Sequence, residues 1–219
     1  MLKNALIAGA TGLVGSELVQ ILIKSDYYNS IHVLGRRPYH LQHLKMKSYI
    51  IDFDKLEDFQ SDALIHDVYI CLGTTMKKAG SKENFRKVDF GYIASLGRWA
   101  KNNKVERICL ISSVGANPHS ANFYLKTKGE AEEVLKALHF RNLIIMRPSL
   151  LLGKRAEFRF AEKSASMMAG FLKLITRGRL MKYTPVEASE VAAAMFHLTR
   201  NASGPLLVAG SAEILKIAQ

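Results

Sequence analysis

Short apolar runs alternate along the chain with longer segments whose apolar residues recur at helical spacing. The short runs are rich in β-branched residues and predict buried strands at residues 5–8, 31–34, 49–51, 68–72, 108–111, 143–146 and 206–208. The longer segments predict helices near residues 13–24, 84–101, 121–138 and 188–199. Strands separated by helices imply right-handed crossovers. The pattern therefore predicts an α/β fold, a doubly wound parallel sheet with helices on both faces.

The segment from residue 153 to residue 185 breaks this alternation, because it is basic and helical in pattern and has no strand pattern. Its adaptable apolar side chains and its basic side chains include Met167, Met168, Phe171, Arg177, Arg179 and Lys182. Such a mixture suits an apolar pocket with positive charge at its rim. We expect this segment to be a small helical cap on the substrate side of a single domain that spans residues 1–219.

The composition suits one soluble α/β domain, since 48% of the 219 residues are hydrophobic and 23% are charged. The longest apolar run is interrupted by Arg147 and Pro148, so we expect no membrane span. The first strand pattern begins at Asn4, which leaves no room for a targeting peptide before it, so we expect a cytoplasmic protein. Cys71 and Cys109 are isolated, which argues against a zinc site and predicts no metal.

The formal net charge of +12 raises the question of a polyanionic partner. The basic residues are spread along the chain as helix faces, and no aromatic-interleaved motif accompanies them, which argues against nucleic acid. An anionic substrate or an acidic partner remains an alternative to a simple solvated surface. The sequence leaves the oligomeric state open.

A glycine-rich loop, Gly9-Ala10-Thr11-Gly12-Leu13-Val14-Gly15, follows the first predicted strand and opens the first predicted helix. The first glycine allows the tight turn, the second lets a pyrophosphate approach the backbone, and the third lets helix and strand pack closely. The helix N-terminus adds free N–H groups and partial positive charge. An ordinary glycine turn is the alternative, but this context is typical of a Rossmann-type dinucleotide-binding fold.

Arg36 and Arg37 follow the second predicted strand, where a fold that prefers NAD usually carries an acidic residue for the ribose 2′-hydroxyl. Two guanidiniums can instead grip a 2′-phosphate in bidentate fashion, and no carboxylate repels it. The residues therefore predict NADP(H) as the cofactor; a pair of solvated surface arginines is the alternative.

Two further loops follow strands at the carboxyl edge of the sheet, where open α/β sheets bind ligands. Asp52 could accept a hydrogen bond from the adenine amine and Phe53 could pack on the base, although Asp52 is equally typical of a turn. Leu72, Gly73 and Thr74 end the fourth strand, and the glycine lets the chain run close beneath a cofactor.

Tyr124 and Lys128 are four residues apart on a predicted helix, so their side chains share one face. Ser112 and Ser113 end the fifth strand just before that helix. An ammonium beside a phenol stabilises the phenolate, and the phenol can then exchange a proton with a carbonyl oxygen. A serine hydroxyl would polarise that carbonyl, and Ser113 is preferred to Ser112. This set predicts a reductase or dehydrogenase, although a Tyr-xxx-Lys spacing is weak without its context.

Together, GATGLVG, the strand-end serines and the Tyr-xxx-Lys pair resemble the short-chain dehydrogenase/reductase superfamily. The segments LGRRP, CLGTTMKKAGS, FRKVD, LISSVGANPHSANFYLKTKGEAE and MRPSLLLGKR resemble one atypical branch, the Tat-interactive oxidoreductase family, from about residue 4 to residue 155. The resemblance implies NADPH binding and Tyr124 as proton donor or acceptor. It also implies cofactor contacts at Thr11, Gly12, Leu13, Val14, Arg36, Arg37, Leu72, Tyr124, Lys128, Pro148, Leu151 and Arg155. Asp89 departs from the superfamily pattern, which has Asn in many members.

The leading hypothesis is an NADP-dependent oxidoreductase that transfers hydride between NADP(H) and a small carbonyl or alcohol, with tyrosine as general acid or base. A second hypothesis is a non-catalytic NADP(H)-binding regulator or redox sensor with a protein partner. An epimerase or dehydratase is a third, but the carboxyl half is short for a sugar-nucleotide domain. The sequence names neither the substrate nor the direction of reaction.

Overall fold

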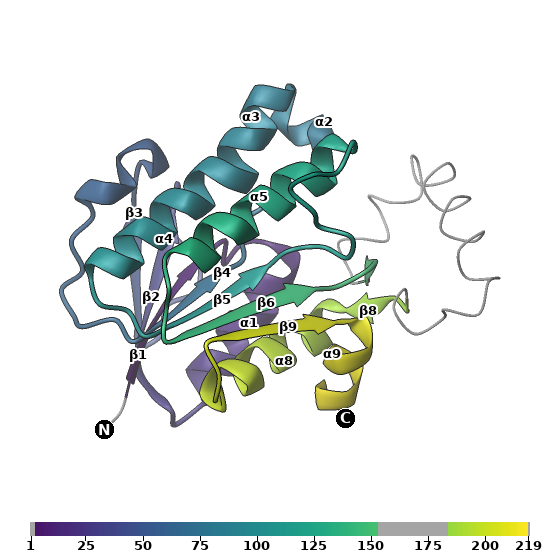
Figure 1. Ribbon diagram of the computed structural model, residues 1–219. Helices are drawn as coiled ribbons and strands as arrows, with labels where there is room; N and C mark the ends of the chain where they lie inside the picture. Colours follow the sequence, from purple (N-terminus) through teal and green to yellow (C-terminus); the bar gives the residue numbers. More distant parts are fainter. Residues whose placement is uncertain (1–2, 153–183, 219) are drawn as a thin grey trace.

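The computed structural model describes residues 3–152 and 184–218. Within these ranges seven parallel strands form one sheet in the order β3-β2-β1-β4-β5-β6-β9 (Figure 1). The strands are β1 Lys3–Ala8, β2 Tyr28–Gly35, β3 Met46–Ile50, β4 Asp67–Ile70, β5 Arg107–Ile111, β6 Asn142–Arg147 and β9 Leu206–Gly210. Each of the seven predicted strand regions contributes to this sheet. The predicted doubly wound α/β fold is therefore confirmed.

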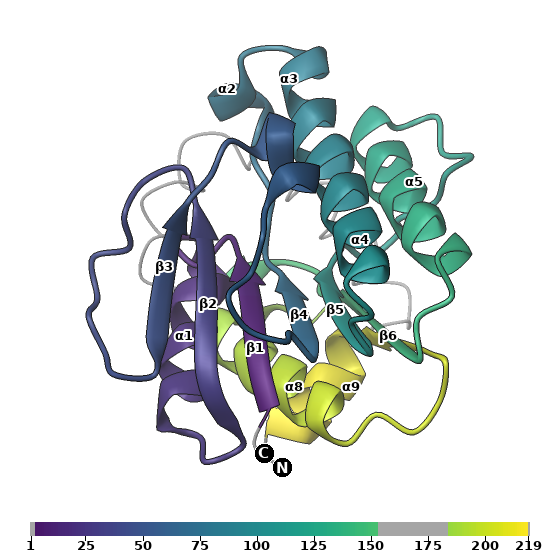
Figure 2. The ribbon, with the colours of Figure 1, turned by 90° about the vertical axis from the view of Figure 1, so that its left-hand side faces the viewer.

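Helices cover both faces of the sheet (Figures 1 and 2). One face carries α1 (Leu13–Lys24), α8 (Ala188–Arg200) and α9 (Ser211–Ala218), and the other carries α4 (Ile93–Asn102) and α5 (Phe123–Ala137). Alternate apolar residues of the central strand β1 pack against the helices on opposite faces of the sheet. Ala5 and Ile7 pack into the core beneath α1 and α8, whereas Leu6 and Ala8 pack into the core beneath α4 and α5. Strands buried on both faces are apolar throughout, which is why the runs are legible in the sequence.

The helix predicted near residues 84–101 is divided into three parts. It begins as α3 (Lys82–Arg86), continues as the π-helical segment η2 (Lys87–Tyr92) and ends as α4. Single π-helical turns inside α-helices are frequently found at functional sites.

The helix α9 was not predicted, and neither were three small features: the 3₁₀ segment η1 (Phe53–Asp58), the short helix α2 (Met76–Ala79), and a parallel pair of two-residue strands, β7 (Leu151–Leu152) and β8 (Val186–Glu187). The predicted cap lies outside the described residues except for residues 184 and 185. None of the helices in residues 3–152 and 184–218 is long and apolar enough to cross a bilayer.

The strand order positions the site. The chain passes from β1 outward to β2 and β3, then returns to β4 on the opposite side of β1. The crevice between the carboxyl ends of β1 and β4 is therefore the topological switch point, where open α/β sheets bind their ligands. The glycine loop follows β1, and Leu72, Gly73 and Thr74 follow β4, so both predicted loops border this crevice.

Candidate functional site

The glycine loop at the end of β1 is shaped as a phosphate-binding turn. Gly9 has a φ of 91°, a backbone conformation that favours glycine, and a Cβ at this position would collide with the carbonyl oxygen of Cys71. A Cβ at Gly15 would collide with the carbonyl oxygen of Gly9. Gly12 caps α1 without a side-chain hydrogen bond, and the first turn of α1 has no acidic residue. This N-terminus therefore offers its N–H groups to an anion, and the glycine cradle fits the pyrophosphate of a dinucleotide.

Arg36 and Arg37 follow the last residue of β2, Gly35, at the carboxyl edge of the sheet. Both arginines are exposed. In the described part of the chain neither guanidinium forms an ion pair with a carboxylate. Both therefore have donors available for an added anion.

Asp52 and Phe53 have structural roles after β3. Asp52 accepts a hydrogen bond from the Asp54 backbone N–H at 3.0 Å and thereby caps η1, which is the turn role that the sequence allowed. Phe53 is 5% exposed, and its ring centroid lies 5.2 Å from that of Tyr92. The adenine contact of these two residues stays a prediction.

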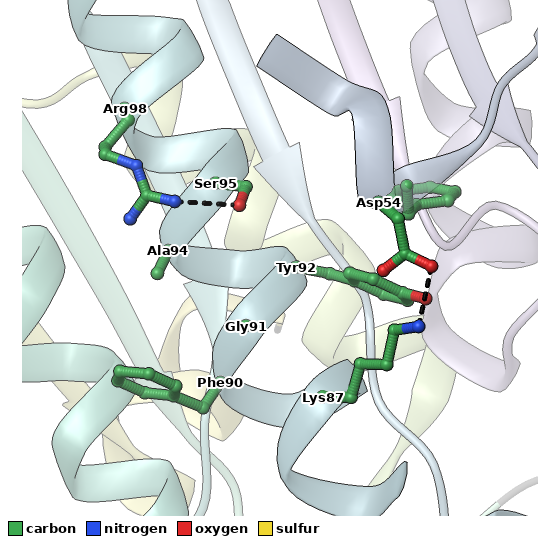
Figure 3. Close-up of a pocket in the computed structure, with 9 residues that line it drawn as sticks. Asp54, Lys87, Phe90, Gly91, Tyr92, Ala94, Ser95 and Arg98 are labelled. Carbon is green, nitrogen blue, oxygen red and sulfur yellow. Dashed lines mark hydrogen bonds and ion pairs between the residues drawn. The ribbon is translucent and has the colours of Figure 1, made fainter.

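A shallow hollow of about 200 Å³ lies beside Phe53, between η1, η2 and α4 (Figure 3). Lys87 and Asp54 form an ion pair of 2.6 Å across it, and Arg98 donates to Ser95 Oγ at 2.9 Å on its far side. The Lys87–Asp54 pair fastens η1 to η2, and a hydrogen bond of 2.9 Å from Arg98 Nε to Glu57 Oε1 fastens η1 to α4.

The predicted pair on α5 is divided between surface and interior. The side chain of Asn122 accepts from the Leu125 N–H and starts the helix, so that Tyr124 lies in its first turn. Tyr124 is 37% exposed and its ring centroid lies 5.8 Å from that of Phe85, whereas Lys128 is 5% exposed. Tyr124 is therefore available at the surface while Lys128 lies beneath it.

Lys128 is paired with a buried carboxylate that the sequence analysis did not place in the site. Its Nζ lies 2.7 Å from Asp89 Oδ1. Burial alone would lower the pKa of Lys128, but Asp89, Tyr124 and Glu132 together outweigh it and raise that pKa above its ordinary value. Lys128 is thus held as an ammonium.

Asp89 connects three elements. It belongs to the π-helical η2, is 1% exposed, and accepts a hydrogen bond from the Thr74 backbone N–H at 2.8 Å through Oδ2. The carboxylate therefore joins the loop after β4 to α5. A signal was present in the sequence, because Phe85, Asp89 and Ile93 recur at helical spacing, and a carboxylate on such an apolar face requires a partner.

The structure distinguishes the two strand-end serines. Ser112 is 5% exposed and donates its hydroxyl to Glu132, which also accepts from Arg147 Nε at 3.0 Å. Ser113 is half-buried, and its hydroxyl has one long bond of 3.3 Å to the Val114 carbonyl. Ser113 is the hydroxyl that can turn toward a substrate, whereas Ser112 helps to anchor α5 to the sheet through a buried glutamate that sequence reasoning missed.

The remaining predicted contacts lie along the same edge. Gly73 is exposed above the Lys128–Asp89 pair, since a Cβ built on it would lie 3.5 Å from Asp89 Oδ1 and 3.7 Å from Lys128 Nζ. The carbonyl of Pro148 accepts from the Val114 N–H at 3.0 Å, which ties the loops after β5 and β6 together. Leu151 lies in β7, and Arg155 lies outside the described residues.

The fold and the phosphate-binding turn define an NAD(P)H-binding Rossmann protein, and a family model described as NAD(P)H-binding matches residues 9–200. The chain belongs to this family and, within it, to the atypical short-chain dehydrogenase/reductases. The predicted resemblance is thereby confirmed.

Two kinds of relative support this assignment. Protein FMP52 of Candida albicans is 35% identical over 227 residues, which cover 98% of each chain, and protein HTATIP2 of Rattus norvegicus is 33% identical over 174 residues, which cover 78% of this chain and 72% of that protein. Among solved structures, the UDP-N-acetylglucosamine 4-epimerase of Methanobrevibacter ruminantium has a TM-score of 0.71 at 17% identity, over 95% of this chain and 76% of that one. The Bordetella bronchiseptica enzyme WbmH in complex with NAD⁺ has a TM-score of 0.70 at 18% identity, over 96% and 76%. At 17% and 18% identity, these two solved structures show that the fold is shared and nothing more.

The expected cytoplasmic location is wrong. The FMP52 relatives of Candida albicans and Debaryomyces hansenii, at 35% and 34% identity, are both named mitochondrial proteins. The expectation rested on the position of the first predicted strand near the start of the sequence, which does not determine the compartment.

Proposed function

We propose that this protein is an NADP-dependent oxidoreductase that interconverts a small carbonyl compound and its alcohol. The observation that carries the proposal is the arrangement on α5, where exposed Tyr124 stands one helical turn before Lys128, which is buried against Asp89. A binding protein needs the glycine loop, but it has no need of a phenol, an ammonium and a strand-end hydroxyl at one edge of the sheet.

Each side chain has a distinct part in the proposed reaction. The bound nicotinamide supplies or accepts the hydride. Tyr124 Oη gives its proton to the carbonyl oxygen in reduction and takes it back in oxidation. Lys128, kept charged by Asp89, stabilises the phenolate and donates to the nicotinamide ribose. Ser113 donates a hydrogen bond to the same oxygen and orients the carbonyl.

The choice of NADP(H) over NAD(H) rests on Arg36 and Arg37, whose exposed guanidiniums form no ion pair with a carboxylate within residues 3–152 and 184–218. A 2′-phosphate would receive charge-assisted hydrogen bonds from them, whereas the hydroxyl of NAD offers no charge. A substrate that is itself anionic and partly apolar would suit the basic and Met-containing segment predicted at residues 153–185, of which residues 153–183 lie outside the described part of the chain. The proposal includes neither nucleic acid nor membrane as a partner.

The test is a screen of aldehydes, ketones and keto acids for NADPH oxidation, followed by the reverse reaction with the matching alcohols. The Tyr124→Phe variant serves as the matched control, because it keeps the ring beside Phe85 and removes the proton. Turnover that depends on Tyr124 supports the proposal. Tight NADPH binding without Tyr124-dependent turnover of any aldehyde, ketone or keto acid would overturn the proposal.

A regulator that binds NADP(H) without catalysis is the second candidate. Two observations favour it: the Lys128 ammonium is paired with Asp89, and the Tyr124 ring packs on Phe85. Such a protein would bind the cofactor equally well with Phe at position 124, and a partner protein would be retained by the loaded form alone.

A further inference from the structure

We propose that Asp89 is a specificity-determining residue for the redox state of the cofactor. Its buried carboxylate favours the oxidised form, whose nicotinamide ring is positively charged, relative to the reduced form, whose ring is neutral. The proposal rests on the proposed function in one respect, the placement of Lys128 beside the nicotinamide ribose.

The position of Asp89 is fixed from two sides. Its Oδ2 accepts from the Thr74 N–H at 2.8 Å, and its Oδ1 lies 2.7 Å from Lys128 Nζ. The residue is 1% exposed, so water screens its charge poorly. It cannot turn away from the site without breaking both interactions.

The pair lies directly beneath the loop that borders the crevice. Gly73 is exposed, and a Cβ on it would lie within 3.7 Å of both the Asp89 carboxylate and the Lys128 ammonium. The Gly73 backbone, in the loop that borders the crevice, therefore lies directly against the pair. Adenosine-binding features lie on the β1–β2 side, so the Asp89 side of the crevice is the nicotinamide side.

The local charge follows from these contacts. Asp89 and Lys128 sum to zero, and Glu132, the next buried acid along α5, is neutralised by Arg147. With Asn in place of Asp89, the same site would carry one positive charge. A cationic ring is repelled by that charge and a neutral ring is not, so Asp89 selects for the oxidised form through charge alone.

The experiment is a charge series measured by calorimetric titration with NADP⁺ and with NADPH at pH 7. Asp89→Asn keeps an acceptor for the Thr74 N–H and raises the local charge by one; Lys128→Gln lowers it by one; the double variant restores zero. We expect the ratio Kd(NADP⁺)/Kd(NADPH) to rise about tenfold in Asp89→Asn and to fall about tenfold in Lys128→Gln. The double variant should return to within about threefold of the natural ratio, even though both affinities fall.

Glu130→Gln is the matched control, because Glu130 pairs with Arg86 on α3 and lies two residues beyond Lys128, on a different face of α5. Its ratio should stay unchanged. A ratio in Asp89→Asn within twofold of the natural protein, while Lys128→Gln weakens both forms equally, would overturn the inference and leave the proposed function standing. If Lys128→Gln weakens neither form, the placement of Lys128 is wrong and both proposals fall. Because the readout is binding, the test needs no substrate.

Discussion

The two halves of the crevice are built in different ways. On the proposed adenosine side, beside β1 and β2, backbone geometry and exposed charge provide the features: Gly9 and Gly15 shape the turn, and Arg36 and Arg37 are exposed after β2. On the proposed nicotinamide side, beside β4 and β5, buried side chains hold one another, as the 2.7 Å Lys128–Asp89 pair shows. The first half depends on residues adjacent in sequence, and the second depends on residues brought together by the fold.

This difference predicts how each half tolerates change. A side chain added to a tightly packed backbone turn distorts the turn, because the atoms that it meets are close-packed. An exposed cation contributes to affinity alone, since water replaces the interaction when it is lost. A buried charged residue is coupled to its partner, so its removal leaves an uncompensated charge behind. The following predictions test this contrast, from the largest expected effect to the smallest.

The largest effect is expected at Gly9. Gly9→Ala places a Cβ against the Cys71 carbonyl oxygen at a φ of 91°, so either the turn or β4 must shift. We expect a loss of at least about 3 kcal/mol in the free energy of unfolding, and NADPH binding at least about 100-fold weaker. Urea unfolding and NADPH titration measure both. Gly204→Ala is the control, because a Cβ there meets nothing within 4 Å; equal losses in the two variants would refute the role of the turn.

The next effect concerns Tyr124. If the protein is a reductase, Tyr124→Phe removes only the transferred proton, so turnover should fall by about 100-fold with the NADPH dissociation constant nearly unchanged. Tyr27→Phe removes a phenol at the opposite edge of the sheet and should leave turnover intact. Steady-state kinetics on the best substrate and NADPH titration separate the two quantities. Undiminished turnover in Tyr124→Phe would exclude Tyr124 from the mechanism and favour the non-catalytic regulator instead.

The elements of the fold could be predicted because strands buried on both faces are continuous apolar runs. The glycine loop could be predicted for a related reason, since its residues are neighbours in the sequence. The role of Arg36 and Arg37 stays a prediction. The sequence analysis was limited where contacts between residues far apart in the chain determine the structure. The π-helical turn that aims Asp89 at Lys128, and the bonds that commit Ser112 to Glu132, join residues 39 and 20 positions apart, which no local pattern encodes. The chain after β9 folds as α9, a helix that the sequence analysis did not predict.

A smaller effect is expected from Arg36 and Arg37. Replacing both with alanine should weaken NADPH binding by about tenfold and leave NADH binding nearly unchanged, because the 2′-phosphate distinguishes the two cofactors. The variant should unfold at the same urea concentration as the natural protein, since neither arginine holds another residue in the described structure. Arg141→Ala combined with Lys24→Ala is the control for the same change in net charge, because both residues are exposed and lie away from the carboxyl ends of the strands. Similar affinities of the natural protein for NADPH and NADH would refute the assignment of NADP(H).

The smallest effect is expected at the β3 edge, where Asp62 forms an exposed counterpart to Asp89. Hydrogen bonds from Lys47 and then Tyr49 lower the pKa of Asp62 to about 2, below its ordinary value of 3.8. A depressed carboxyl pKa stabilises the fold above the unfolded value, and this contribution is lost as the pH falls from about 4 to about 2. We therefore expect the natural protein to resist urea slightly better than Asp62→Asn at pH 6, with the difference vanishing near pH 2. Because Asp62 is exposed, 1 M salt should also reduce the difference at pH 6, whereas the ratio of dissociation constants set by buried Asp89 should change little with salt. If 1 M salt leaves the stability difference between the natural protein and Asp62→Asn unchanged, exposed and buried ion pairs respond to salt in the same way. The contrast between exposed charges and buried charge pairs would then lose its electrostatic basis.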